Sequence, residues 1–154
     1  MSKVILSAVD VEIANLKAKL RPLERAKIGL TVDPNTPLPG EAMPDGTVYA
    51  GVSPTTDRAL YVMPSDLYGE YPWAKAMDIA WREDFGGYKN WRLPTKEELK
   101  LLFANRIAIR GFTTAAYWSA TENHGGTAWY FGFQSGMLTY TTQRNAHAIR
   151  CVRS

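Results

Sequence analysis

The sequence is poor in cysteine, in histidine and in net charge, and each shortage excludes a class of function. One cysteine, Cys151, among 154 residues excludes a disulfide within the chain and a cysteine metal cluster. The two histidines, His124 and His147, form no Ser-His-Asp or Cys-His spacing, so we expect no enzyme. A net charge of +3, with no basic stripe carrying interleaved aromatic residues, predicts no nucleic-acid partner.

Carboxylates and long apolar runs are also missing where they would matter. Glu122 is the only carboxylate between residues 117 and 153, so we expect no calcium or other metal there, and no cofactor. Near the start, the apolar residues 4–6 are soon followed by Asp10 and Glu12, which is too short and too acidic for a signal peptide or a transmembrane helix. We therefore expect that the protein does not insert into a membrane and that it assembles in the cytoplasm. A particle released later by lysis fits equally well.

The first 46 residues are expected to comprise a helix, residues 1–27, and a linker, residues 28–46. In the helix, apolar residues recur at alternating spacings of three and four, which is the a/d pattern of a coiled coil: Leu6, Val9, Ile13, Leu16, Leu20 and Leu23. Such a helix either packs on its own domain or mediates oligomerisation, and the narrow, regular seam slightly favours oligomerisation. Four prolines and two glycines between Asp33 and Gly46 disfavour regular structure in the linker.

From residue 47 the pattern is that of an α+β domain. Residues 47–52 and 59–63 predict a hairpin. A helix follows from Pro72 to the glycines at 86–87, with an apolar face of Trp73, Ala76, Met77, Ala80, Trp81 and Phe85. A second helix starts with a capping box of Thr95 and Glu98. Strands are expected at residues 117–121, 127–133, 137–141 and 146–152, which gives two helices beside an antiparallel, hairpin-rich sheet.

Several segments of this body resemble the motifs of one family. Residues 86–99, GGYKNWRLPTKEEL, resemble the signature GGYxxWRLPTxxEL, and residues 117–122, YWSATE, resemble YWSSTE. Residues 128–136 and 149–153 resemble the ending AWxxxFxxG followed by VRCVR. With these motifs in the right order, residues 47–153 resemble the C-terminal domain of the Legionella collagen-like adhesin family.

This resemblance implies a C-type lectin-like fold, in the variant shared with formylglycine-generating enzymes and the variable proteins of diversity-generating retroelements. Members are generally read as ligand-binding modules of adhesins, surface proteins and phage tails, which implies glycans as one ligand class and a trimer as one assembly. Many members have a second cysteine in the first helix, where this chain has Ala80. The lone Cys151 therefore suggests a reducing compartment, as for a phage or cytoplasmic protein. The predicted ligand-binding domain spans residues 47–154.

Most motif residues are expected to be structural. Trp73, Trp81, Trp91 and Trp129 fall on predicted inner faces, and the motif position of Trp118 also favours the core. Arg92 is expected to satisfy backbone carbonyls or to pair with a carboxylate such as Glu122. Cys151, between Arg150 and Val152, is expected to be a small buried residue.

The candidate binding surface is the other face of the C-terminal strands together with their loops. Its side chains are rigid amphipathic anchors and adaptable hydrogen-bonding groups, as in antibody combining sites: Asn123, His124, Tyr130, Gln134, Met137, Thr139, Thr141, Gln143, Arg144, Asn145 and His147. An ordinary solvated sheet face is the alternative. Relatives with this fold place variable ligand residues there, so residues 141–147 would be the diversified region of a retroelement target.

The sequence thus predicts a non-enzymatic protein that binds a protein or glycan ligand on a cell surface. A phage tail protein or a retroelement-diversified receptor-binding protein, trimeric through its N-terminal helix, fits this prediction. A glycan-binding lectin or adhesin is one alternative. A structural virion subunit, with the same sheet face packed on a neighbouring subunit, is another.

Overall fold

The computed structural model describes residues 13, 15, 16 and 35–154. The chain divides into two units, residues 1–36 and 37–154, and all strands and helices named below belong to the second. The helix predicted at residues 1–27 lies outside the described residues except for residues 13, 15 and 16, which are helical. The linker up to residue 34 lies outside them too. None of the described helices is long and apolar enough to cross a bilayer.

The hairpin predicted after residue 47 is confirmed. β1 (Val48–Val52) and β2 (Ala59–Val62) pair antiparallel, and β2 also pairs with β8 (Val152–Arg153) to complete a three-stranded sheet. The register of β1 shifts between Tyr49 and Gly51, where Gly51 has a φ of 121°. Only glycine adopts that backbone conformation readily, so this residue allows the irregularity.

Part of the predicted linker lies along this hairpin. The Gly40 amide donates to the Tyr49 carbonyl at 2.8 Å, and the Tyr49 amide donates to the Glu41 carbonyl at 2.9 Å. Ala42 forms an isolated bridge with Val48. Backbone pairing therefore fixes residues 40–42 to the body.

A second sheet has five strands in the order β3-β7-β4-β5-β6. β4 (Ala116–Asn123), β5 (Thr127–Gly132) and β6 (Met137–Thr142) are antiparallel and correspond to predicted strands. β7 (His147–Ile149) pairs parallel with β4 and antiparallel with β3 (Leu67–Tyr71). The sequence does not predict β3, because the three central residues of this edge strand are all exposed and follow no alternation of buried and exposed positions.

The single strand predicted at residues 146–152 is wrong. The chain leaves the five-stranded sheet after Ile149 and enters the three-stranded sheet at Val152. Arg150, between them, is fully buried; its Nε donates to the Met63 carbonyl at 2.8 Å and its Nη1 to Asp66 at 2.9 Å. A buried guanidinium needs several acceptors, and these acceptors lie outside the β7 ladder, so the strand breaks at this residue.

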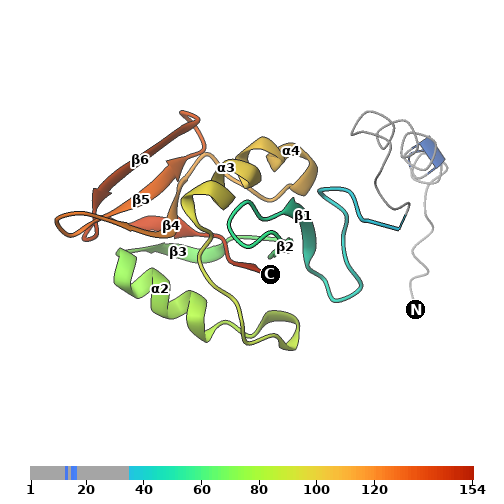
Figure 1. The fold of residues 1–154 in the computed structure, drawn as a ribbon, viewed down its shortest axis with the longest axis horizontal. Coiled ribbons are helices and arrows are strands. Elements are labelled where there is room, and N and C mark those ends of the chain that lie inside the picture. Colours follow the sequence, from blue (N-terminus) through green and yellow to red (C-terminus); the bar gives the residue numbers. More distant parts are fainter. Residues whose placement is uncertain (1–12, 14, 17–34) are drawn as a thin grey trace, which may run out of the picture. The chain divides into compact units, whose positions relative to one another are not determined.

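Two helices lie on opposite faces of the five-stranded sheet, as Figure 1 shows. α3 (Lys96–Ala104) begins with the predicted capping box. The Glu98 backbone amide donates to the Thr95 hydroxyl, and the Thr95 backbone amide donates to the Glu98 carboxylate. α2 (Trp73–Arg82) ends four residues before Gly86, and Phe85 starts a separate 3-10 turn, Phe85–Gly87. A short helix, α4 (Arg106–Ile109), follows α3 and is not predicted by the sequence.

The core has two parts, one on each face of the five-stranded sheet. One gathers α3 residues with Tyr117 and Phe131 and with the three-stranded sheet, and the other gathers α2 residues with Trp91 and Trp118. The predicted core positions of Trp91 and Trp118 are confirmed, since both are 0% exposed. The core position predicted for Trp81 is wrong, because its ring is 73% exposed at the edge of the apolar stripe of α2.

Candidate functional site

The surface predicted for binding lies on the side of the five-stranded sheet that α2 occupies. Tyr130 on β5 lies opposite Thr139 on β6, and Met137 and Thr141 are two residues from Thr139, so these four side chains share one face. His147 on β7 stacks on Tyr130 with the ring centroids 4.4 Å apart. We call Tyr130, Met137, Thr139, Thr141 and His147 the polar sheet face.

The helix covers only one part of this side of the sheet. α2 packs on β3, β4 and β7, and Trp118 of β4 is fully buried there. Tyr130, Thr139 and Thr141, on the outer strands, are partly exposed, and Met137 is 61% exposed. The polar sheet face is therefore accessible along β5 and β6.

The buried Trp118 supports the polar sheet face and forms an aromatic cluster with two of its members, Tyr130 and His147. Trp118 meets His147 edge to face at 4.5 Å and Tyr130 at 6.2 Å, while Tyr130 and His147 are stacked at an interplanar angle of 26°. Trp118 is itself fixed, because its Nε1 donates to the Tyr71 carbonyl at 2.7 Å. The cluster therefore holds the Tyr130 ring in one orientation at the edge of the open surface.

The His147 imidazole is neutral at pH 7. Burial lowers the pKa of His147 below its ordinary value of 6.5, and the negative charge of Glu70 opposes that shift only in part. The Nε2 atom is buried and has no hydrogen-bond partner among the described residues. An uncharged ring stacks on Tyr130 without the desolvation cost that an imidazolium would carry.

Two turns meet at one end of the polar sheet face. The Gln143 backbone amide donates to the Gly126 carbonyl at 3.0 Å, and this hydrogen bond joins the β6–β7 turn to the β4–β5 turn. The Gln143 side chain donates to Glu122 at 3.1 Å, and the Asn145 side chain donates to Thr141 at 2.7 Å. The amide side chains predicted for binding therefore shape the turns.

Other predicted residues of these turns differ in exposure and position. Asn123 donates to Thr127 at 3.1 Å, whereas His124 and Arg144 are exposed and project from the turns. Gln134 lies in the β5–β6 turn at the opposite end of β5, roughly 20 Å away at the usual rise of a strand. The structure thus brings ten of the eleven predicted residues to the polar sheet face or to its joined turns, and Gln134 lies in the turn at the far end.

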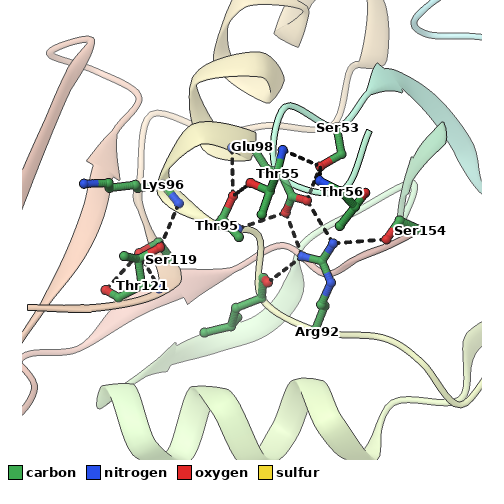
Figure 2. A network of polar contacts seen from close by, with 11 residues as sticks. Ser53, Thr55, Thr56, Arg92, Thr95, Lys96, Glu98, Ser119, Thr121 and Ser154 are labelled. Atoms are coloured by element: carbon green, nitrogen blue, oxygen red, sulfur yellow. Dashed lines mark hydrogen bonds and ion pairs between the residues drawn. The ribbon is translucent and has the colours of Figure 1, made fainter. Parts of the chain in front are cut away.

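A second set of polar residues joins segments that are far apart in the sequence, as Figure 2 shows. Arg92 pairs with Glu98 through both guanidinium nitrogens, at 2.7 and 2.8 Å, rather than with Glu122 as the sequence suggested. Ser53 donates to the same carboxylate at 2.6 Å. Glu98 is 0% exposed. Burial alone would raise the pKa of Glu98, but the hydrogen bonds from Arg92, Ser53 and the Thr95 amide outweigh it and lower the pKa. This ion pair is an element of the framework.

Two further observations concern the reactive side chains of the described residues. Cys151 is free and fully buried, as predicted, and burial raises the pKa of its thiol to about 12, so little thiolate exists at neutral pH. Among residues 35–154 and the three described earlier ones, no three His, Cys, Asp or Glu side chains are grouped as metal ligands.

An aromatic pair outside the predicted binding surface lies on the opposite side of the sheet. Trp129 and Tyr140 meet edge to face at 5.2 Å, the ammonium of Lys96 lies 4.5 Å from the Trp129 ring, and Tyr140 is 53% exposed. The alternation along β6 places Tyr140 opposite to Thr139, but only the β5–β6 register reveals its partner.

Comparison with known proteins adds one finding to this geometry. A family model described as the Lcl C-terminal domain matches residues 46–153, which covers the hairpin, both helices and the five-stranded sheet. No curated protein sequence matches the chain significantly.

Proposed function

Because this chain belongs to the Lcl C-terminal domain family, we propose that it is the recognition domain of an adhesin-type surface protein. It binds its ligand on the polar sheet face and catalyses no reaction. The aromatic cluster of Trp118, Tyr130 and His147 is the main support for this proposal. A tyrosine ring stacked on a neutral imidazole, which itself packs on a buried tryptophan, is a rigid, amphipathic anchor, and little conformational entropy is lost when a ligand packs on it.

The chemistry of the polar sheet face suits a glycan as well as a protein. A sugar ring has an apolar C–H surface that packs on an aromatic side chain, and hydroxyl groups around its rim. Tyr130 offers the ring, and Thr139 and Thr141 offer hydroxyls beside it. Arg144 and His124 at the joined turns add polar contacts at one end. We therefore retain a glycan as the alternative ligand to a surface protein.

The finer parts of the proposal rest on the resemblance together with this surface. They comprise a C-type lectin-like fold, a role on a phage tail or as a retroelement-diversified receptor-binding protein, and a trimer formed through residues 1–27. Cytoplasmic assembly is supported by Cys151, which is free and buried, so the domain does not depend on a disulfide.

The proposal is tested by blocking the face without removing any core packing. Thr139→Arg places a long side chain on the polar sheet face, and Thr142→Arg places the same side chain on the other face of the same strand. Binding of labelled protein to target cells should fall by about tenfold or more for Thr139→Arg, the loss expected when an interface anchor is covered. Thr142→Arg should bind as the parent does.

The cells themselves identify the ligand class. Periodate oxidation of the cell surface should abolish binding if the ligand is a glycan, and protease treatment should abolish it if the ligand is a protein. Equal binding by both arginine variants would refute the polar sheet face as the binding surface. If Thr139→Arg instead disrupts an assembly of the chain with itself, the face packs between subunits and the structural role replaces recognition.

A further inference from the structure

A pocket separate from the polar sheet face lies beside α4. It has a volume of about 410 Å³ and is lined by Arg106, Arg110, Phe112, Thr113, Thr114 and Phe133, among others. That volume lies within the range of small-molecule sites. None of its lining residues belongs to the polar sheet face.

The pocket carries two arginines whose charge is not balanced within the described part of the chain. Arg106 is held in place, because its Nη1 donates to the Phe103 carbonyl at 2.8 Å and its guanidinium lies 4.0 Å from the Phe103 ring. The side chain of Arg110 is exposed. No aspartate or glutamate of residues 35–154 forms a salt bridge with either arginine, and none of these residues that line the pocket is acidic.

Arg110 has a backbone conformation that an arginine adopts at a cost. Its φ is 68° and its ψ is 174°, a region that is occupied almost only by glycine. The conformation is imposed by its surroundings, since the Arg110 carbonyl accepts a hydrogen bond from the buried Arg150 at 2.9 Å. Glycine would satisfy the backbone with less strain, so the arginine side chain at this position has a use of its own.

The other lining residues include two phenylalanines and are held by contacts of their own. The centre of the Phe112 ring lies 4.2 Å from the guanidinium carbon of Arg150 and 4.8 Å from the centre of the Phe133 ring. The Thr113 amide donates to the Tyr117 hydroxyl at 2.9 Å, and that hydroxyl donates to Asp66 at 2.6 Å. The backbone of these residues is therefore fixed before any ligand arrives.

We infer that this pocket binds a small organic acid, with its carboxylate on Arg106 and Arg110 and an apolar body against Phe112 and Phe133. Planar guanidinium groups match a carboxylate in geometry as well as in charge. The phenylalanine rings discriminate against a bare, strongly hydrated anion such as sulfate. The ligand is thus distinguished from the one proposed for the polar sheet face by its charge and its site.

The test is an NMR titration of the full chain with benzoate, benzamide and sulfate as probes. Benzoate should shift the amide resonances of Thr113 and Thr114, and benzamide, which has the same ring without the charge, should bind about tenfold or more weakly. Sulfate should also bind more weakly than benzoate.

Arg106→Gln and Arg110→Gly should each weaken benzoate binding by about tenfold or more, and Arg110→Gly should unfold at the same temperature as the parent or at a higher one. Arg58→Gly, an exposed arginine in the β1–β2 turn, serves as the matched control and should leave benzoate binding unchanged.

Three results would overturn the inference. Benzamide or sulfate binding as tightly as benzoate would remove the carboxylate or the apolar part of the recognition. Benzoate affinity retained in both Arg106→Gln and Arg110→Gly would place the acid elsewhere. An equal loss in Arg58→Gly would mean a general effect of net charge. Because Arg106→Gln leaves the strained backbone of residue 110 unaltered, the test remains decisive even if Arg110→Gly folds poorly.

Discussion

Glu98 is a fully buried carboxylate whose negative charge is balanced by Arg92 and by two further donors. Replacing it with glutamine removes the charge but leaves Arg92 without its ion-pair partner, and a broken buried pair costs about 3–5 kcal/mol of stability. We expect Glu98→Gln to lower the free energy of unfolding by about 3 kcal/mol in urea denaturation. The neighbouring Glu97 is 45% exposed, so Glu97→Gln should change it by less than about 0.5 kcal/mol. Similar values for the two variants would contradict the structural role assigned to Glu98.

His147 makes the aromatic cluster sensitive to acid. Its pKa is lowered in the folded protein by burial, so the folded state binds protons less readily than the unfolded chain does. The contribution of the neutral imidazole to stability is therefore fully present above the ordinary pKa of 6.5, and it decreases as the pH falls below that value. The facing carboxylate of Glu70 moderates the loss.

We expect His147→Phe to remove this dependence, because phenylalanine keeps a ring between Tyr130 and Trp118 and has no group that titrates. Thermal unfolding followed from pH 5 to pH 8 checks this result. The exposed His124 provides the control, and His124→Phe should keep the pH dependence of the parent. A parent protein whose unfolding temperature is constant over this range would contradict the assignment.

At the scale of elements, the sequence predicts those whose signals are local. The hairpin and the capping box of α3 depend on residues a few positions apart, and both are confirmed. β3 and the break at Arg150 depend on partners far along the chain, with Leu67 opposite Ile149 and Arg150 bonded to Met63. Periodicity within a segment contains no information about such partners.

The segment before β1, residues 40–47, also depends on partners far along the chain, and Asp45 holds it in place through them. The Thr47 hydroxyl and amide, together with Tyr88 and Arg153, stabilise its carboxylate and lower the pKa of Asp45 to about 2. Because the folded pKa is below the ordinary 3.8, the stabilisation is present above pH 3.8 and is lost as the pH falls toward 2.

Asp45→Asn should abolish that acid-dependent part, which we expect to be about 1 kcal/mol after solvent screening is allowed for. Urea denaturation between pH 2 and pH 6 measures it, and amide exchange at Thr47 should become faster in the variant. Asp57→Asn, in the β1–β2 turn, is the matched substitution and should leave both quantities unchanged. Slow exchange at Thr47 in Asp45→Asn would show that the backbone pairing of residues 40–42 holds the segment without the carboxylate.

At the scale of the whole molecule, residues of the family motifs form part of the core and the Arg92–Glu98 ion pair. Trp91, Arg92 and Glu98 come from the first motif and Cys151 from the last, and all four contribute to buried packing or to the buried ion pair. This is why the sequence identifies the family and most of the fold. The polar sheet face lies outside these structural positions, and its aromatic cluster depends on the register of β4, β5 and β7, so only part of the site could be predicted.

Assembly is the property of the whole molecule that decides how such a surface works. Weak sites on a trimer can engage a cell surface together, and their joint affinity can exceed that of one site by about 10²–10⁴-fold. Ile13 and Leu16 of the predicted seam are 45% and 51% exposed, so both are available to a second chain.

We expect light scattering to give three chain masses for the full chain and one for a chain that begins at Pro37, the first residue of the second unit. That start retains the pairing of residues 40–42 with β1, so the shortened chain should keep the unfolding temperature of its domain. Ile13→Asp in the full chain should also give monomers, because a charge at a seam position is not tolerated between packed helices, whereas Lys17→Asp, outside the seam, should not. A trimer that persists after truncation would transfer the subunit contact to the domain itself. In that case the exposed Met137 and Tyr140 on the two faces of β6 would be the first positions to test, and the polar sheet face would have to be shared between ligand and neighbour.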